Sequence, residues 1–278
     1  MAPTRIIVVP YDSGRRDVRM GAGPRQLAPH IAKALRDAGH DVRIDEISAD
    51  VESVRGELAI TIDLLTSLAE SVRDARANGE FPLVLAGNCN SSLGTVAGLG
   101  AELHNDLSVC WFDAHGDFNT PETSVSGFID GMALAMLTGR CWSAITRRIP
   151  GFQPVAERQV TQVGVRHPDP AEISLLETSD IRRIAANSRT DEEIRAALAQ
   201  APAIYVHLDL DVLDESEGRA NQYACGGGLT SAALLDALRG LASINRVQAL
   251  ALTAYDPAVD TDGRIRRIAL EAVRTIAS

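Results

Sequence analysis

The sequence predicts an α/β fold of three layers, with a mostly parallel central sheet between two layers of helices. Short apolar runs rich in β-branched residues alternate along the 278 residues with longer amphipathic stretches. This alternation is typical of βαβ units, whose parallel sheets are covered on both faces. Two acidic clusters also follow directly on two of the apolar runs, at strand ends, where such folds place their functional sites.

Seven short runs predict strands because they concentrate Val, Ile and Leu between turn-forming residues. In chain order, they cover residues 5–10, 41–47, 82–87, 107–112, 159–165, 203–208 and 247–254. The first of them reads Arg-Ile-Ile-Val-Val-Pro and lacks the apolar core of a secretory signal peptide. We therefore interpret it as the first strand of the fold.

Six amphipathic stretches between the strands predict helices, because their apolar residues recur with the period of one helix face. In chain order, they cover residues 24–38, 51–78, 91–101, 192–199, 231–241 and 264–276. The polar stretch 117–131 is rich in Thr, Ser and Gly, which predicts a loop over the site. No long low-complexity linker and no fixed-period repeat divides the chain, so we expect one domain over residues 1–278.

The composition limits the classes of partner. Lys and Arg total 27 against 37 Asp and Glu, which gives a formal net charge of −10 and disfavours nucleic acid and anionic membranes. No run approaches 18 uninterrupted apolar residues, so no membrane span is expected. The four cysteines lack the spacing of a disulfide scaffold, which favours a reducing cytoplasm. We expect a cytoplasmic protein that binds a small molecule.

The two acidic clusters predict a divalent metal site, and their number of ligands favours a binuclear one. Residues two apart on a strand point the same way, so the side chains of each cluster can converge. Isolated buried charges are costly, and a bound cation compensates them. The side chains concerned are Asp113, His115, Asp117, Asp209 and Asp211. The plainer alternative is a set of helix caps and loop acids.

These clusters carry a resemblance to a known family. Residues 113–127 resemble a signature of the ureohydrolase (arginase/agmatinase) family. They read Asp-Ala-His-Gly-Asp-Phe-Asn-Thr-Pro-Glu-Thr-Ser-Val-Ser-Gly. Residues 209–214, with 226–230, resemble its second signature in the same order. The resemblance implies an arginase-like fold and two Mn²⁺ ions that activate water for attack on a guanidinium carbon. It also implies a homo-oligomer, either a trimer or a hexamer.

The resemblance assigns metal ligands by motif position. Asp113 and Asp209 would bridge both metals, and Asp117 would bind the first. His115 and Asp211 would bind the second. Asp117 would also act in catalysis by orienting the attacking water. Hard carboxylate oxygens with one imidazole suit Mn²⁺, and two neighbouring cations lower the pKa of a shared water.

The resemblance also assigns residues that bind an amino-acid substrate. Asn119 and Ser126 match positions that hold the α-carboxylate, and Asp169 and Glu172 match acids that hold the α-amino group. A carboxamide and a hydroxyl facing a carboxylate, with carboxylates facing an ammonium, suit a zwitterion. The alternatives are ordinary turn residues for the first pair and first-turn acids of a helix after Pro170 for the second.

Three positions depart from the family pattern. The first metal motif, a glycine pair followed by Asp-His-Ser, reads Ala-Gly-Asn-Cys-Asn over residues 86–90 and places Cys89 at the histidine. Cys89 is either a ligand that favours Zn²⁺ over Mn²⁺ or a buried apolar residue, and a single bound ion is then possible. Asp130 replaces a histidine assigned to proton relay, and we expect it to be catalytic because an aspartate can also relay protons; the alternative is an acid at the start of a helix. Ala254 replaces a glutamate that pairs with the guanidinium, while Asp256 lies two residues on.

Together these features predict a metal-dependent hydrolase that cleaves a C–N bond of a guanidino or amidino amino acid. The departures favour an arginine derivative such as Nω-hydroxyarginine over arginine itself, because a branch of the family that acts on it also lacks the first histidine. That branch keeps its glutamate, so the match is incomplete. The alternative is a weakened or inactive relative that binds metal and an amino acid or a protein partner. His207, inside a predicted strand, is expected to be a core histidine rather than a partner of the metal site.

Overall fold

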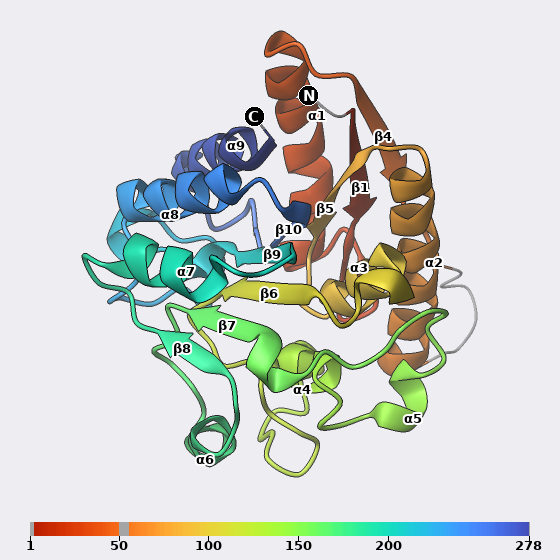
Figure 1. Cartoon of the computed structure of the whole chain (residues 1–278), viewed down its shortest axis with the longest axis vertical. Coiled ribbons are helices and arrows are strands. Elements are labelled where there is room, and N and C mark those ends of the chain that lie inside the picture. The colour runs from red at the N-terminus through yellow and green to blue at the C-terminus, as the bar shows by residue number, and fades with distance from the viewer. Residues whose placement is uncertain (1–2, 50–55, 278) are drawn as a thin grey trace.

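A central sheet of eight parallel strands organises the part of the chain that the structure, a computed structural model, describes: residues 3–49 and 56–277 (Figure 1). Every pair of neighbouring strands in this sheet is parallel. From edge to edge the strands are β4 (Val42–Glu46), β1 (Thr4–Val9), β5 (Phe81–Ala86), β10 (Val247–Thr253), β9 (Ala203–Asp209), β6 (Leu107–Phe112), β7 (Val160–Val163) and β8 (Arg182–Ile184). The predicted parallel α/β sheet is confirmed.

Helices cover both faces of the sheet and complete the three layers (Figure 1). One layer contains α2 (Glu57–Ala77), α3 (Ser91–Leu99) and α4 (Ala133–Leu137). The other contains α1 (Gly23–Asp37), α7 (Thr190–Leu198), α8 (Ser231–Ile244) and α9 (Arg264–Ala277). Two short helices, α5 (Ser143–Thr146) and α6 (Pro170–Glu177), lie outside the main layers (Figure 1).

Alternation along the strands explains why both faces are covered. In β1, Ile7 and Val9 belong to the core under α2, whereas Ile6 and Val8 belong to the core under α1. Each of these four side chains is buried, and burying one such side chain contributes about 1.5–3 kcal/mol. A strand that is apolar on both sides is stable only with a helix layer on each face.

The predicted elements match the observed ones closely, with a few omissions. All seven predicted strands are present, and their ends differ from the prediction by at most two residues. The predicted helix 51–78 is observed as α2 from Glu57, and residues 51–55 lie outside the described residues. The edge strand β8 was not predicted, because its two arginines are exposed and break the apolar pattern. The hairpin of β2 (Tyr11–Asp12) and β3 (Arg15–Arg16) was also missed, since its strands are too short for any periodicity.

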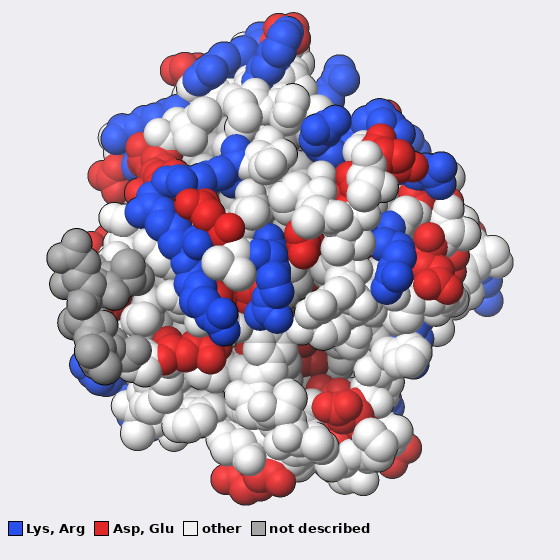
Figure 2. Space-filling view, turned by 180° about the vertical axis from the view of Figure 1, so that it is seen from behind, with Lys and Arg blue, Asp and Glu red and all other residues white. Residues whose placement is uncertain are grey.

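Charged groups on the surface are mixed in sign. On the face seen from behind in Figure 2, basic side chains lie beside acidic ones. Arg25, for example, pairs with Asp17 at 2.7 Å and with Glu46 at 2.6 Å. In the described part of the chain, no helix is both long enough and apolar enough to cross a membrane.

Gly87, directly after β5, brings three segments close together. A Cβ atom at this position would collide with the carbonyl oxygen of Tyr11 and would lie 2.8 Å from the Cα atom of Gly21. Both neighbours are backbone atoms, which cannot move aside as a flexible side chain can. The glycine thus lets the turn after β5 pass under the first loop of the chain, and this turn carries Cys89.

Gly87→Ala is therefore expected to destabilise the fold by about 1–3 kcal/mol, the usual cost of overpacking a buried site. Thermal unfolding measures the change. Gly131→Ala is the matched control, because a Cβ there meets no atom within 4 Å. Equal melting temperatures for the two variants would show that the close approach is not needed.

Candidate active site

A cavity of about 330 Å³ opens at the carboxyl ends of the central strands. The strands β5, β10, β9 and β6 are neighbours in the sheet, so the segments that follow them meet at one edge. Every site residue expected from the sequence lines this one cavity: Cys89, Asp113, His115, Asp117, Asn119, Ser126, Asp130, Asp169, Glu172, Asp209 and Asp211. The structure thus brings together side chains that lie up to 122 positions apart in the chain.

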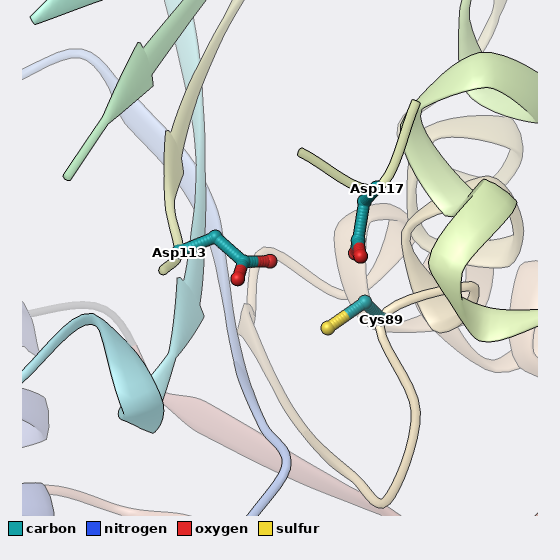
Figure 3. A group of neighbouring side chains, drawn as sticks. All are labelled: Cys89, Asp113 and Asp117. Carbon is teal, nitrogen blue, oxygen red and sulfur yellow. The ribbon is translucent and has the colours of Figure 1, made fainter. Parts of the chain in front are cut away.

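One group of potential metal ligands combines Cys89, Asp113 and Asp117 (Figure 3). Their donor atoms lie within 4.8 Å of one another, and all three residues are buried. In Figure 3 the three side chains point toward one another, Cys89 from the segment after β5 and the two aspartates from the segment after β6. The Cys89 thiol also donates a hydrogen bond of 3.0 Å to Oδ2 of Asp209. Asp209 therefore adjoins this first donor group.

A second donor group combines Asp113, His115 and Asp211, again within 4.8 Å. Nδ1 of His115 lies 3.3 Å from Oδ2 of Asp211 and 3.5 Å from Oδ1 of Asp113. Oδ1 of Asp209 accepts a hydrogen bond of 2.8 Å from the Asp211 amide. Asp113 thus belongs to both groups, and Asp209 contacts a member of each. Asp113 and Asp209 would therefore be the side chains nearest to both donor groups if cations were bound.

The electrostatics of the cluster favour the binding of a cation. Burial, together with the surrounding carboxylates, raises the pKa of Asp117 and of Asp209 well above the usual value. Burial acts against the charged form of His115, but hydrogen bonds to Asp113 and Asp211 raise its pKa to about 12. Among the described residues, Oδ2 of Asp117 is buried and has no hydrogen-bond partner. A carboxylate oxygen in this state is a good ligand for a cation.

The two donor groups differ in how well they suit Mn²⁺. The second group offers only carboxylates and an imidazole, the ligands this ion prefers. The first group includes the Cys89 thiol, whose pKa is raised well above its usual value by burial and then by Asp209. The thiol would have to lose its proton to bind, and a thiolate favours softer ions than Mn²⁺. The second group therefore fits manganese, and the first fits it less well.

Asp117 adopts a left-handed backbone conformation, with φ of 51°. Its carbonyl oxygen accepts hydrogen bonds from the amides of Leu134 and Ala135, at the start of α4. A residue other than glycine in this conformation costs about 1–3 kcal/mol and is typical of functional sites. Here the bonds to α4 hold the turn, so the Asp117 side chain is directed at Cys89 and Asp113 (Figure 3).

The four expected substrate residues already have partners within the protein. Nδ2 of Asn119 donates to Asp169 at 2.9 Å, and Oγ of Ser126 accepts from the amide of Phe128 at 3.2 Å. Glu172 is buried and accepts from the amides of Phe118 at 2.6 Å and Asp169 at 3.0 Å. Asp169 and Glu172 form the capping box of α6. The turn and cap roles weighed as alternatives are therefore present, and they coexist with a place on the cavity wall.

Asp130 and Ala254, the two other positions that depart from the expected motifs, also lie on the cavity wall. Asp130 is buried, and its pKa is raised to about 7 by that burial, against hydrogen bonds from the amide of Asn90 and the side chain of Asn88. Ala254, at φ of 60°, presents only a methyl group. Asp256 is not part of the cavity lining. Its carboxylate instead accepts a hydrogen bond from the amide of Ala258. The carboxylate two residues on does not take the place of the absent glutamate.

Several lining residues were not identified from the sequence: Met20, Phe128, His167, Asn221 and Tyr223. Asn221 donates to Asp211 at 3.2 Å and to the carbonyl of Ala254 at 3.0 Å, so it ties the metal cluster to β10. The rings of Phe128 and Tyr223 lie 6.2 Å apart beside the cavity. Met20 lies in a short 3-10 helix and the other four in loops, where no periodicity marks a residue as part of the cavity wall.

His207 is a core residue, as expected. Its ring stacks on Trp111 with centroids 3.7 Å apart, and burial lowers its pKa to about 3. The Tyr205 hydroxyl lies 3.1 Å from Nδ1 and the Thr253 hydroxyl 3.4 Å from Nε2. Thr253 in turn lies 3.4 Å from the Cys89 sulfur.

Metal binding is expected to change the pH dependence of stability. Because the pKa of Asp117 and Asp209 is raised on folding, the metal-free protein keeps their favourable contribution at low pH and loses it as pH rises. Cations bind the deprotonated ligands and reverse this trend. We expect Mn²⁺ to raise Tm more at pH 8 than at pH 6, and a chelator to cancel the gain. A gain that is equal at both pH values, or absent, would contradict this.

Comparison with known proteins agrees with the geometry. The sequence model of the Arginase family matches residues 2–278. The arginase of Bacillus caldovelox is 31% identical over 97% of this chain and 96% of its own length, and that of Bacillus subtilis is 28% identical over 98% and 96%. The crystal structure of arginase from Bacillus cereus superposes with a TM-score of 0.90 at 26% identity, covering 99% of this chain and 98% of its own. Formimidoylglutamase from Bacillus subtilis shares the fold, with a TM-score of 0.75 at 19% identity over 99% and 85%.

Proposed function

The chain belongs to the arginase family, and on that basis we propose that it is a metal-dependent hydrolase cleaving a C–N bond of a guanidino or amidino amino acid. The observation that carries the proposal is the shared position of Asp113 in two donor groups on the wall of one cavity. A structural role for these acids alone would leave several carboxylates buried without compensation, which is costly.

Two divalent cations, Mn²⁺ by relation to the family, would be held by the two donor groups. Cys89, Asp113, Asp117 and Asp209 would hold the first, and Asp113, His115, Asp209 and Asp211 would hold the second. Cations bound in this way lower the pKa of water and supply the nucleophile near neutral pH. The thiol in the first group supports unequal affinities, with the second position filled first.

The protein's own residues would bind and orient the substrate. Asn119 and Ser126 would receive its α-carboxylate, and Asp169 and Glu172 its α-ammonium. Asp117 would orient the attacking water through its unpartnered carboxylate oxygen. Asp130 would act at the reacting end of the substrate. The methyl group at Ala254 leaves room beside that end, which supports an N-substituted guanidine such as Nω-hydroxyarginine over arginine.

A substrate screen tests the proposal. The protein loaded with Mn²⁺ is assayed with arginine, Nω-hydroxyarginine, agmatine, guanidinobutyrate and formiminoglutamate, following urea, hydroxyurea, formamide or amine. We expect turnover of the N-hydroxylated substrate to exceed that of arginine. No product from any of the five at full metal occupancy would overturn the hydrolase proposal. Calorimetric binding without product would instead favour the alternative, an inactive relative that binds metal and an amino acid.

We also propose a cytoplasmic homo-oligomer, a trimer or a hexamer as in the family resemblance. All four cysteines are free thiols, which supports a reducing compartment. Light scattering on the purified protein measures the assembly, and a monomer at micromolar concentration would contradict it.

A further inference from the structure

Asp130, one of the three departures from the family pattern, is in direct contact with Asn88, which lies inside the first metal motif. Nδ2 of Asn88 donates a hydrogen bond of 2.8 Å to Oδ2 of Asp130, across 42 positions of the sequence. Both residues are buried, and Asp130 lies on the cavity wall. The contact therefore joins two segments that are distant in the sequence.

The orientation of the Asn88 amide is fixed by its surroundings. Its oxygen accepts from the amide of Ser13 at 2.9 Å, so the NH₂ group must face Asp130. Oδ1 of Asp12 lies 3.5 Å from the same nitrogen. Asp12 is buried and paired with Arg19, whose Nε lies 2.8 Å from its Oδ2. The amide nitrogen of Asn88 therefore lies between two carboxyl groups and donates its shorter hydrogen bond to Asp130.

Both oxygens of Asp130 receive an N–H donor. Oδ2 accepts from Asn88, and Oδ1 accepts from the amide of Asn90 at 3.0 Å. An asparagine amide and a backbone amide do not take up a proton, so this side of Asp130 offers no path for proton relay. Each carboxylate oxygen retains a lone pair for a donor in the cavity. Asp130 is built as a fixed acceptor and not as a shuttle.

The cavity offers few other carboxylates to a cationic substrate group. Of the acids that line it, four belong to the two donor groups or adjoin them, namely Asp113, Asp117, Asp209 and Asp211. Glu172 holds two backbone amides, and Asp169 accepts from Asn119. Ala254 contributes no charge. Asp130 is left as the lining acid that belongs to neither donor group and that the proposed function does not use for the α-ammonium.

We propose that Asp130 is the specificity residue that binds the cationic guanidine or amidine group of the substrate, in place of the glutamate absent at Ala254, and that Asn88 is the residue that positions it. This inference rests on the proposed function, which supplies a substrate with such a cation. A planar cation against a buried carboxylate acceptor forms a charge-assisted hydrogen bond, whereas an uncharged analogue gains far less.

Calorimetry with arginine and citrulline tests the proposal. The two ligands have the same amino-acid end, but the opposite end is a cationic guanidinium in arginine and an uncharged group in citrulline. The protein is loaded with Mn²⁺. We expect the wild type to bind arginine more tightly than citrulline. Asp130→Asn should raise the Kd for arginine by at least about tenfold, while the Kd for citrulline changes by less than threefold. Asp256→Asn, which alters an acid outside the cavity, is the matched control. It should leave the ratio of the two dissociation constants unchanged.

Two further variants separate binding from a merely structural effect. Asp130→Asn combined with Ala254→Glu should restore the preference for arginine, because a carboxylate returns to the cavity from β10. Asn88→Ala should reduce the preference less than Asp130→Asn does, since it leaves the charge in place but frees it to rotate. For any substrate that is turned over, Asp130→Asn should raise KM more than it lowers kcat, and the pH profile of kcat should keep its shape.

The outcomes separate this inference from the proposed function. If the wild type discriminates arginine from citrulline but Asp130→Asn discriminates equally well, the assignment of Asp130 is wrong and the hydrolase proposal stands. A fall in kcat with unchanged KM, with loss of one limb of the pH profile, would likewise reject it in favour of proton relay. If the metal-loaded wild type binds neither arginine, Nω-hydroxyarginine nor agmatine, both proposals fail.

Discussion

Asp113→Asn is expected to remove most of the bound metal and to lower kcat/KM by at least about 1,000-fold, equivalent to roughly 4 kcal/mol of transition-state stabilisation. Asp113 belongs to both donor groups, so one substitution weakens both metal positions. Its carboxylate also accepts hydrogen bonds from the amide of His115 at 2.7 Å and from the indole of Trp111 at 3.1 Å. An asparagine preserves the shape but supplies one neutral oxygen and an NH₂ group that faces these donors.

Elemental analysis of the metal-to-protein ratio, together with the rate on the best substrate, measures the effect. Thermal unfolding without metal is the control for folding. Removing a buried charge from a crowded acidic cluster should leave that metal-free stability unchanged or slightly higher. Asp256→Asn, in an acid outside the cavity, should retain metal and activity. Wild-type metal content in Asp113→Asn would show that the two donor groups do not share this ligand.

The convergence of the acidic side chains could be predicted because its information is local. Asp113, His115 and Asp117 alternate after one apolar run, and Asp209 and Asp211 follow another. Parallel strands that are neighbours in a sheet end at the same edge, so two short motifs suffice to place these five side chains in one cavity. The fold followed from the same kind of pattern, because long amphipathic helices and apolar strands have clear periods.

What could not be predicted depends on contacts between distant segments. Asn221 joins Asp211 to β10, yet nothing in its own neighbourhood distinguishes it from a loop asparagine. The contact of Asn88 with Asp130 is likewise visible only in three dimensions. In the sequence, nothing links the two positions, which lie 42 residues apart.

Restoring two family residues should create arginine hydrolysis that the native chain lacks or performs slowly. We expect Cys89→His with Ala254→Glu to raise kcat/KM for arginine by at least about 100-fold over the native protein, or roughly 2.7 kcal/mol. An imidazole binds metal in its neutral form, whereas the buried Cys89 thiol beside Asp209 must first lose a proton. A glutamate at the end of β10 adds a partner that matches the planar guanidinium through two hydrogen bonds.

Each single variant should gain much less than the pair, because activity requires both a filled first metal position and a correctly oriented substrate. Residues that act together on one reaction are strongly non-additive, so the excess of the double variant over the sum of the singles measures their coupling. Metal content should rise with Cys89→His alone, while arginine affinity should rise with Ala254→Glu alone. Two bound ions in the double variant without faster arginine turnover would mean that the cavity is shaped for another substrate, and that the two substitutions are adaptations rather than losses.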